Sequence, residues 1–98
     1  MSRTAAISEA QRDDEALRVT FWQFPPGSET GWHRHEVPYM VVPVMGGTLT
    51  VEDSAGSRAS PIEAGGSYSR PAGVEHNIAN DTEAAISFVE IEFKRGNA

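Results

Sequence analysis

Three histidines are the residues of this chain whose type and spacing could do chemistry. His33 and His35 are separated by one residue, and His76 lies in the second half of the sequence. Alternate residues of a strand point to the same face, so the first two imidazoles are expected to project side by side. Neutral imidazoles are ligands for Zn, Fe, Ni or Cu, and three of them leave positions open for water or substrate. Because a His-X-His pair often occurs by chance, the metal site depends on a fold that brings His76 to the pair.

The elements that must position these histidines are short strands. Apolar, aromatic and β-branched residues gather in segments that are separated by turns rich in Gly, Pro and Asp. The predicted strands are 17–24, 39–45, 48–52, 67–70, 74–78 and 86–93, with a hairpin loop at 53–57. Pro43, inside one strand, indicates an edge position or a bulge. Many short strands with closely spaced turns predict an all-β sandwich or barrel.

Two stretches of the chain carry a family resemblance. The residues involved are Gly27, His33, His35, Tyr39 and Gly46 in the first stretch, and Gly65, Pro71, Gly73, His76 and Asn80 in the second. Their spacing resembles the two signature motifs of the cupin superfamily, small cupin 2 type proteins in particular, with all but one of ten positions matching. The resemblance implies a double-stranded β-helix, or jelly-roll, barrel with a divalent metal ion on the three histidines. The glycines and Asn80 are interpreted as turn formers.

The departure from the family pattern is Tyr39, where a metal-ligating glutamate is usual. The chain therefore resembles the three-histidine cupins, and Tyr39 becomes a candidate catalytic residue. Its phenol could orient a ligand, donate a proton or ligate a ferric ion, or its ring could simply line the barrel. Glu36 and Glu75 adjoin histidines but point away on a regular strand. A bend at Pro38 would re-aim Glu36, which is kept as an alternative ligand.

Other side chains are candidates for the wall of a pocket or for the core. Five of them are apolar, with core packing as the simpler interpretation: Trp22, Met40, Val42, Met45 and Phe88. In the last strand, Glu90 and Glu92 share a face. We expect this face to meet solvent, with Val89 and Ile91 pointing inward.

The resemblance implies a function as well as a fold. Three-histidine cupins resemble non-haem iron dioxygenases acting on β-dicarbonyl or thiol-like substrates, in which substrate binds at the open metal positions before dioxygen attacks. Fe(II) is the expected metal, with Zn, Ni, Mn and Cu as alternatives; zinc or nickel would instead support hydrolysis, lyase chemistry or isomerisation. The alternatives are a non-catalytic module that binds a small ligand or metal, and a structural protein whose site is vestigial.

Length and composition limit the domain organisation. The 98 residues suffice for one domain, and no cysteine is present to form disulfides or thiolate metal sites. The predicted division is a polar N-terminal segment or added edge strand at 1–16, a cupin barrel at 17–94 and a tail at 95–98. A core this small is thin, which, together with the habit of small cupins, predicts a homodimer.

Charge limits the partners. The net charge is −6 and no stretch concentrates Lys or Arg, so neither nucleic acid nor an anionic membrane is an expected partner. No apolar run is long enough to cross a bilayer, and the start of the chain lacks the pattern of a secretory signal. The sequence predicts a cytoplasmic protein that binds a small-molecule substrate.

Overall fold

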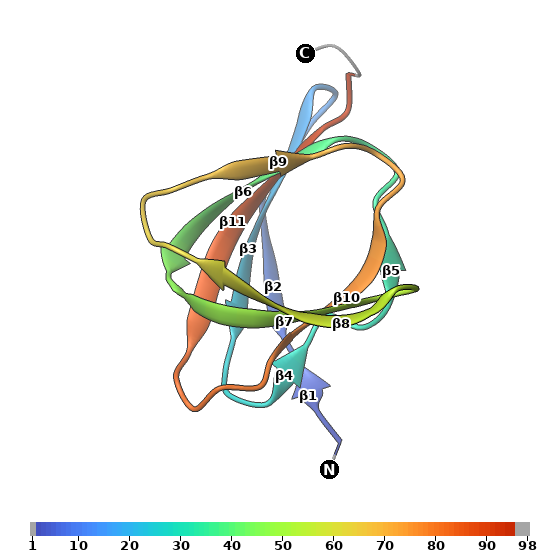
Figure 1. Ribbon diagram of the computed structural model, residues 1–98. Helices are drawn as coiled ribbons and strands as arrows, with labels where there is room; N and C mark the ends of the chain where they lie inside the picture. The colour runs from blue at the N-terminus through green and yellow to red at the C-terminus, as the bar shows by residue number, and fades with distance from the viewer. Residues whose placement is uncertain (1, 96–98) are drawn as a thin grey trace.

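The computed structural model describes residues 2–95, which form two β-sheets wrapped into a barrel (Figure 1). The first sheet has the order β1 (Thr4–Ala5), β4 (Ser28–Glu29), β10 (Glu75–Asn80), β7 (Gly47–Asp53) and β8 (Gly56–Ile62), with β5 (His33–Arg34) also paired to β10. The second has the order β2 (Ile7–Asp13), β3 (Leu17–Phe24), β11 (Ile86–Phe93), β6 (Tyr39–Met45) and β9 (Tyr68–Arg70). The predicted all-β barrel is therefore confirmed.

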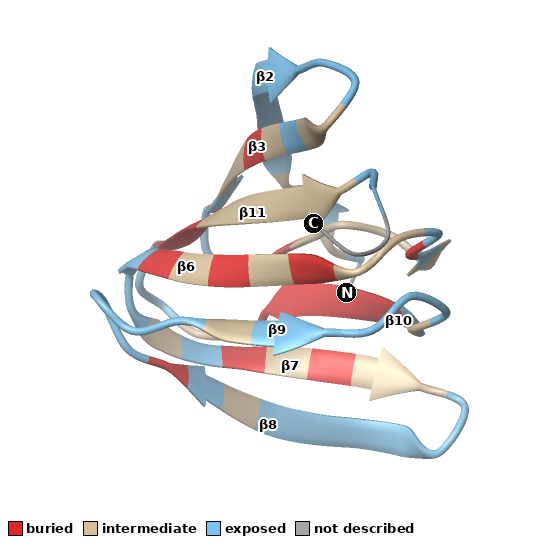
Figure 2. Ribbon diagram, turned by 90° about the horizontal axis from the view of Figure 1, so that it is seen from above, coloured by how far each residue is buried: buried red, intermediate tan, exposed pale blue. Residues whose placement is uncertain are grey.

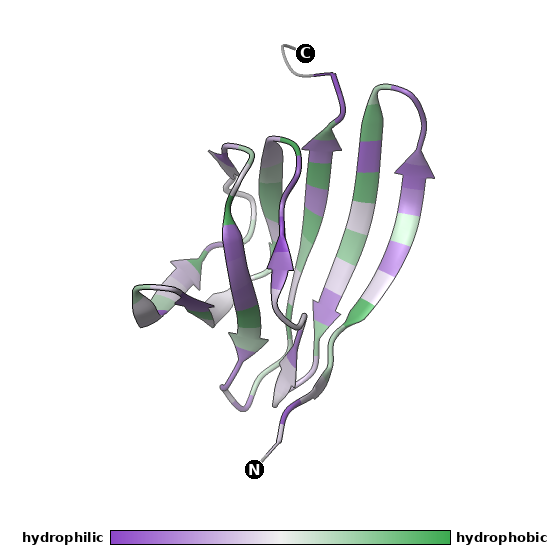
Figure 3. Ribbon diagram, turned by 90° about the vertical axis from the view of Figure 1, so that its right-hand side faces the viewer, coloured by the Kyte–Doolittle hydropathy of each residue, from purple (hydrophilic) through white to green (hydrophobic). Residues whose placement is uncertain are grey.

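Side chains from both sheets meet inside the barrel. Phe24, Leu49 and Ile86 are almost fully buried, and the ring of Phe24 lies 5.4 Å from that of Phe88. Figure 3 shows the apolar and polar bands that alternate along the strands. This alternation follows from the strand period of two, which sends successive side chains to opposite faces of the sheet.

Strand β6 shows how the chain passes between the sheets. The strand lies between β11 and β9, but its pairing with β9 covers only residues 39–41, so Pro43 lies just beyond it. Its register against β11 shifts just after Pro43, which confirms the predicted bulge at a residue that cannot donate to the ladder. At Gly46, which follows β6, a Cβ atom would lie 2.8 Å from the Ile62 carbonyl oxygen, so only glycine fits this close passage into β7.

Strand β11 carries a correction to the sequence prediction. The side chains of Glu90 and Glu92 are only 12% and 22% exposed, whereas Val89 and Ile91 lie half-buried on the opposite face. The expectation that the two glutamates meet solvent is wrong. Phe88 fixes the inward face of the strand, and the period of two then carries both glutamates onto it.

The apolar candidates on β6 also follow the alternation of inner and outer faces. Met40 and Val42 alternate with the buried Tyr39 and Val41, so they lie on the outer face of β6. Met45, at the end of that strand, is 52% exposed. In the described part of the chain, none of these three residues lines a cavity that also touches a histidine, and none belongs to the buried core that was the simpler interpretation.

The first residues of the chain add strands to both sheets. β2 pairs with β3 at the edge of the second sheet and is exposed along its whole length (Figure 2). β1 pairs in parallel with β4 in the first sheet. At the other end, Arg95 lies 3.0 Å from Glu15, and the remainder of the predicted tail, 96–98, lies outside the described residues.

The described part of the chain holds strands and turns but no helix, and hence no helix that could cross a membrane.

Candidate metal centre

The three histidines meet at one end of the first sheet. His33 lies in β5 and His76 in β10, and the two are direct partners in the antiparallel pairing of these strands. His76 therefore lies beside the pair rather than across the barrel from it. His35 follows β5, where its N–H donates to Val74 and its carbonyl accepts from Gly73, at 2.8 and 2.7 Å. This turn fixes the third imidazole against the other two.

The ring nitrogens of the histidines converge. The Nε2 atom of His35 lies 3.1 Å from that of His33 and 3.3 Å from that of His76. Two nitrogens that each lie about 2.0–2.1 Å from one ion are about 2.8–3.4 Å apart at octahedral or tetrahedral angles. The spacing of the three nitrogens thus fits ligands of one ion, and imidazole is a suitable donor for Zn, Fe, Ni or Cu.

The surroundings keep the imidazoles available as ligands. Burial, and then the neighbouring imidazoles, lower the pKa of His35 to about 4, and burial and His33 lower that of His76 to about 4. Both rings are therefore neutral near pH 7, which is the form that binds metal.

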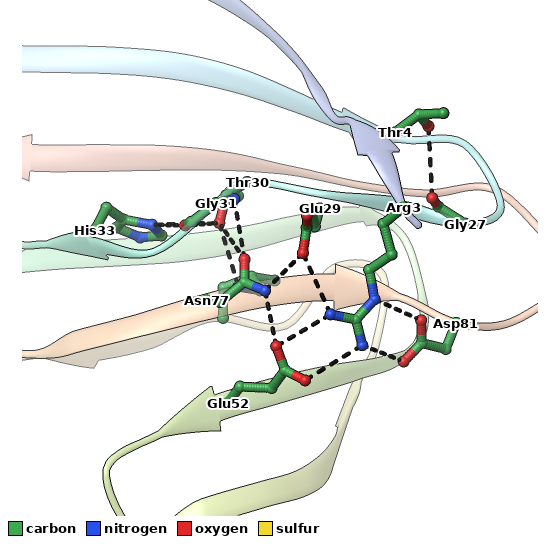
Figure 4. A network of polar contacts seen from close by, with 11 residues as sticks. Arg3, Thr4, Gly27, Glu29, Thr30, Gly31, His33, Glu52, Asn77 and Asp81 are labelled. Carbon is green, nitrogen blue, oxygen red and sulfur yellow. Dashed lines mark hydrogen bonds and ion pairs between the residues drawn. The ribbon is translucent and has the colours of Figure 1, made fainter. Parts of the chain in front are cut away.

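The orientation of His33 is fixed by its other ring nitrogen. Nδ1 lies 2.8 Å from the carbonyl oxygen of Gly31, an acceptor, so Nδ1 carries the proton and Nε2 presents its lone pair (Figure 4). The backbone N–H of Gly31 in turn donates to the Asn77 side chain at 2.9 Å. Sequence reasoning missed Asn77 because a buried asparagine after a histidine carries no recognisable pattern.

Tyr39 lies against the centre. Its ring stacks on the His35 imidazole with the centroids 3.8 Å apart and the planes inclined by 17°. It is 3% exposed, and burial, followed by the charge of Glu90, raises its pKa to about 12, so the phenol keeps its proton. A packing contact with a proposed ligand is thus observed, while the catalytic role of Tyr39 stays a prediction.

The carboxylates adjacent to the histidines point elsewhere. Glu36 is 76% exposed at its side chain and pairs with Arg34 at 3.1 Å, and Glu75 is exposed. Within residues 2–95 neither belongs to a group whose ligand atoms converge. Glu36 therefore does not re-aim toward the histidines as the alternative interpretation required.

A different carboxylate reaches the centre from the second sheet. The Oε2 atom of Glu90 lies 3.9 Å from His35 Nε2, and burial, with a smaller effect of Glu92, raises the pKa of Glu90 to about 7. Sequence reasoning placed this residue in solvent. The signal that could have found it is the parity of β11, since Glu90 lies two residues beyond the core residue Phe88.

Two of the cavities that adjoin the histidines have room for a small molecule. One of about 240 Å³ is bordered by His33, His35 and Glu90, with Trp22 and Phe88 as apolar walls. The other, of about 530 Å³, lies on the side of His76 and has a more polar wall, formed by Tyr39, Tyr68, Arg58 and Arg70 among others. A small molecule could thus approach the nitrogens from either side.

Comparison with known sequences identifies relatives of the whole chain. The family model of the cupin domain matches residues 20–92. A protein of Pseudomonas aeruginosa, named beta-alanine degradation protein BauB, is 47% identical over 92 residues, which cover 94% of this chain and 97% of the relative.

Solved structures give the same result for the fold. A cupin domain from Bordetella pertussis superimposes with a TM-score of 0.93 at 51% identity, covering 96% of this chain and 98% of the other. An RmlC-like cupin with a double-stranded β-helix fold from Methanocaldococcus jannaschii gives a TM-score of 0.76 at 14% identity, covering 92% and 81%. The jelly-roll topology predicted from the two motifs is thereby confirmed.

Proposed function

Because the chain belongs to the cupin family, we propose that it holds one divalent metal ion through His33, His35 and His76 and acts on a small molecule bound beside that ion. The observation that carries this proposal is the convergence of three imidazole nitrogens, 3.1 and 3.3 Å from the central one, at the border of two cavities. Fe(II) is the metal we propose first, and Zn, Ni, Mn and Cu are the alternatives.

A bound ion would supply Lewis acidity and, in the case of iron, a redox centre for chemistry with dioxygen. Glu90 would accept a proton from an acidic C–H or S–H group of the substrate, since its carboxyl borders the same cavity as two of the ligands. Trp22 and Phe88 would exclude water from that cavity. Tyr39 would hold the His35 ring by stacking or donate a proton from its phenol.

The reaction class we propose is dioxygenation of a β-dicarbonyl or thiol-like compound. The name of the Pseudomonas relative refers to β-alanine degradation, which supports a small metabolite as the substrate. Three neutral donors suit zinc as well as iron, and this supports a second candidate, a non-catalytic module that binds a metal or a small ligand.

The test begins with metal content, measured by plasma mass spectrometry on protein purified without chelator or affinity nickel. We expect about one equivalent per chain, and loss of the metal in His76→Ala. The iron-loaded protein should then consume oxygen with a β-diketone or a thiol. Metal that binds without oxygen consumption would favour the binding module. No metal even after reloading would remove the metal-dependent enzyme and leave only a module that binds a small ligand.

The assembly and location remain proposals as well. We propose a cytoplasmic location and a homodimer. The homodimer is supported by half-buried apolar side chains on the outer face of the second sheet, among them Val42, Val89 and Ile91. Light scattering tests the dimer, and a mass equal to one chain would contradict it.

A further inference from the structure

The metal ligand His33 is connected to the start of the chain by a continuous series of hydrogen bonds. The first link is the carbonyl oxygen of Gly31, 2.8 Å from His33 Nδ1. Gly31 has a φ of +90°, a left-handed conformation that aims this carbonyl at the ring. Its backbone N–H donates to Asn77 Oδ1 at 2.9 Å, so the Asn77 amide holds in place Gly31, the residue whose carbonyl sets the His33 tautomer.

The orientation of the Asn77 amide is itself determined by its neighbours. Its Nδ2 group donates to Glu29 Oε1 and to Glu52 Oε1, both at 2.8 Å. A flipped amide would place its oxygen against these two carboxylates and its NH₂ group against the Gly31 N–H. Asn77 is 6% exposed, so water offers little alternative.

Arg3 holds the carboxylates that orient the amide. Its guanidinium lies 3.2 Å from Glu29 Oε1 and 3.0 Å from Glu52 Oε1, and it forms two bonds of 2.9 Å with Asp81 (Figure 4). Without Arg3, the carboxylates of Glu29 and Glu52 would converge beside Asn77 with no cation between them. They would separate, and the two acceptors of the Asn77 amide would move with them.

We propose that Asn77 is a positioning residue for the metal ligand His33, and that Arg3, near the start of the chain, keeps Asn77 in the orientation that this requires. The inference rests on the proposed metal function. It assigns part of the metal affinity to Asn77 and Arg3. Neither residue occupies a ligand position of the two family motifs, and neither is proposed to contact the metal or the substrate.

The first experiment needs no metal. Long-range ¹H–¹⁵N NMR of the imidazoles should show His33 with its proton on Nδ1 in the unaltered protein. In Asn77→Ala and in Arg3→Ala we expect a mixture of tautomers at His33 while His76 is unchanged. If His33 keeps a single Nδ1–H tautomer in both variants, the proposal is overturned, whether or not the protein binds metal.

The second experiment measures metal binding by competition titration with Co(II), whose visible spectrum reports the coordination geometry. Asn77→Ala should bind Co(II) about 10- to 100-fold more weakly and with a changed spectrum. Arg3→Ala should weaken binding less, and Arg3→Lys least, because lysine keeps the charge but loses the planar fork. The Arg3→Lys variant keeps the test open if Asn77→Ala fails to fold.

The matched control is Arg12→Ala. It removes another arginine near the start of the chain, paired with Asp14 at 2.6 Å but remote from Asn77. Its Co(II) affinity and spectrum should equal those of the unaltered protein. Equal affinity and spectrum in the Asn77 and Arg3 variants as well would contradict the proposal, while absence of Co(II) binding in the unaltered protein would contradict the proposed function alone.

Discussion

The carboxylates around Arg3 and the carboxyl group of Glu90 differ in what balances their charge. Glu29, Glu52 and Asp81 surround Arg3, which holds the pKa of Glu52 and of Asp81 below the usual range. Glu90 has no such partner: among residues 2–95 the one basic group within ion-pair distance is His35, at 3.9 Å. The pKa of Glu90 is accordingly raised to about 7, chiefly by burial.

The comparison separates carboxylates that stabilise the fold from one that costs stability. A paired cluster favours the folded state because its charges are compensated there. A buried carboxyl without a cation disfavours it, and such groups gather at functional sites. A metal ion on the three histidines would supply a positive charge close to Glu90, in addition to the small effect of Arg18.

The largest expected effect tests whether the Glu90 side is indeed a metal site. Replacing His76 with alanine removes one of three donors and should abolish stoichiometric binding of zinc, measured by plasma mass spectrometry after gel filtration. Arg3→Ala should retain about one equivalent under the same conditions, since Arg3 is not a ligand. Full zinc content in His76→Ala would mean that the ion binds elsewhere, and the contrast between Glu90 and the Arg3 cluster would then say nothing about a metal site.

The next effect is the response of the metal-free protein to acid. The folded pKa of His35 and of His76 is about 4, whereas that of an unfolded histidine is 6.5. Between pH 4 and 6.5 the two histidines bind protons in the unfolded chain but not in the folded protein. Their contribution to the free energy of unfolding is therefore fully present above pH 6.5 and falls as the pH drops toward 4. We expect a loss of about 3 kcal/mol or more in urea titrations across this window.

The acid response also has a control. Zinc holds the histidines deprotonated, so the loaded protein should keep its stability to a lower pH than the metal-free protein. Glu90 titrates with the opposite sign in this window, so the deciding measurement uses Glu90→Gln. A metal-free Glu90→Gln protein equally stable at pH 4.5 and 6.5 would mean that His35 and His76 are not shielded as the structure indicates.

A smaller loss of stability is expected when the cluster around Arg3 is disrupted. Arg3→Ala leaves three carboxylates without their shared cation and should lower the free energy of unfolding by about 2–3 kcal/mol at pH 7 in urea titrations. High salt should reduce the difference by screening the remaining repulsion. Arg12→Ala, which breaks an exposed pair, is expected to change stability by less than about 0.5 kcal/mol; an equal loss in both variants would remove the special role of Arg3.

The sequence was sufficient for most of the strands and insufficient for those that are exposed or very short, among them β2 and β8. Strands β3, β6 and β11 begin and end where the runs of apolar residues predict. β8 was missed because Gly56–Ile62 is mostly exposed and carries a proline, so it has no alternating pattern. It is held by its pairing with β7, a long-range contact that local composition does not encode.

The residues of the site also differ in whether the sequence could predict them. The three histidines were predictable because their spacing is part of a family motif. Glu90 was missed because both faces of β11 carry apolar residues and the charged face was assigned to solvent, although its parity with Phe88 indicated the inward face. Asn77 and Arg3 were not predictable, because hydrogen bonds between residues so distant in the sequence exist only once the barrel has formed. Polar groups that become partners through topology leave no local signal.

The smallest effect has the opposite sign to that of Arg3 and sharpens the comparison most. The folded pKa of Glu90 is about 7 and its unfolded value is 4.5, so the folded state loses stability as the pH rises between these values. Glu90→Gln removes this cost. We expect the metal-free variant to be about 1–2 kcal/mol more stable than the unaltered protein at pH 8 and equal to it at pH 4, in paired urea titrations.

Zinc gives this last prediction its diagnostic value. An ion on the histidines compensates the Glu90 carboxylate, so the advantage of Glu90→Gln at pH 8 should disappear in the loaded proteins. Glu52→Gln, whose carboxylate already has a cation in Arg3, should lower stability with or without zinc. If Glu90→Gln is destabilising in the metal-free protein, the carboxyl is already balanced there. Glu90 and the carboxylates around Arg3 would then both be balanced in the metal-free protein. The inference that Glu90 marks a functional site because its charge is unbalanced would fail.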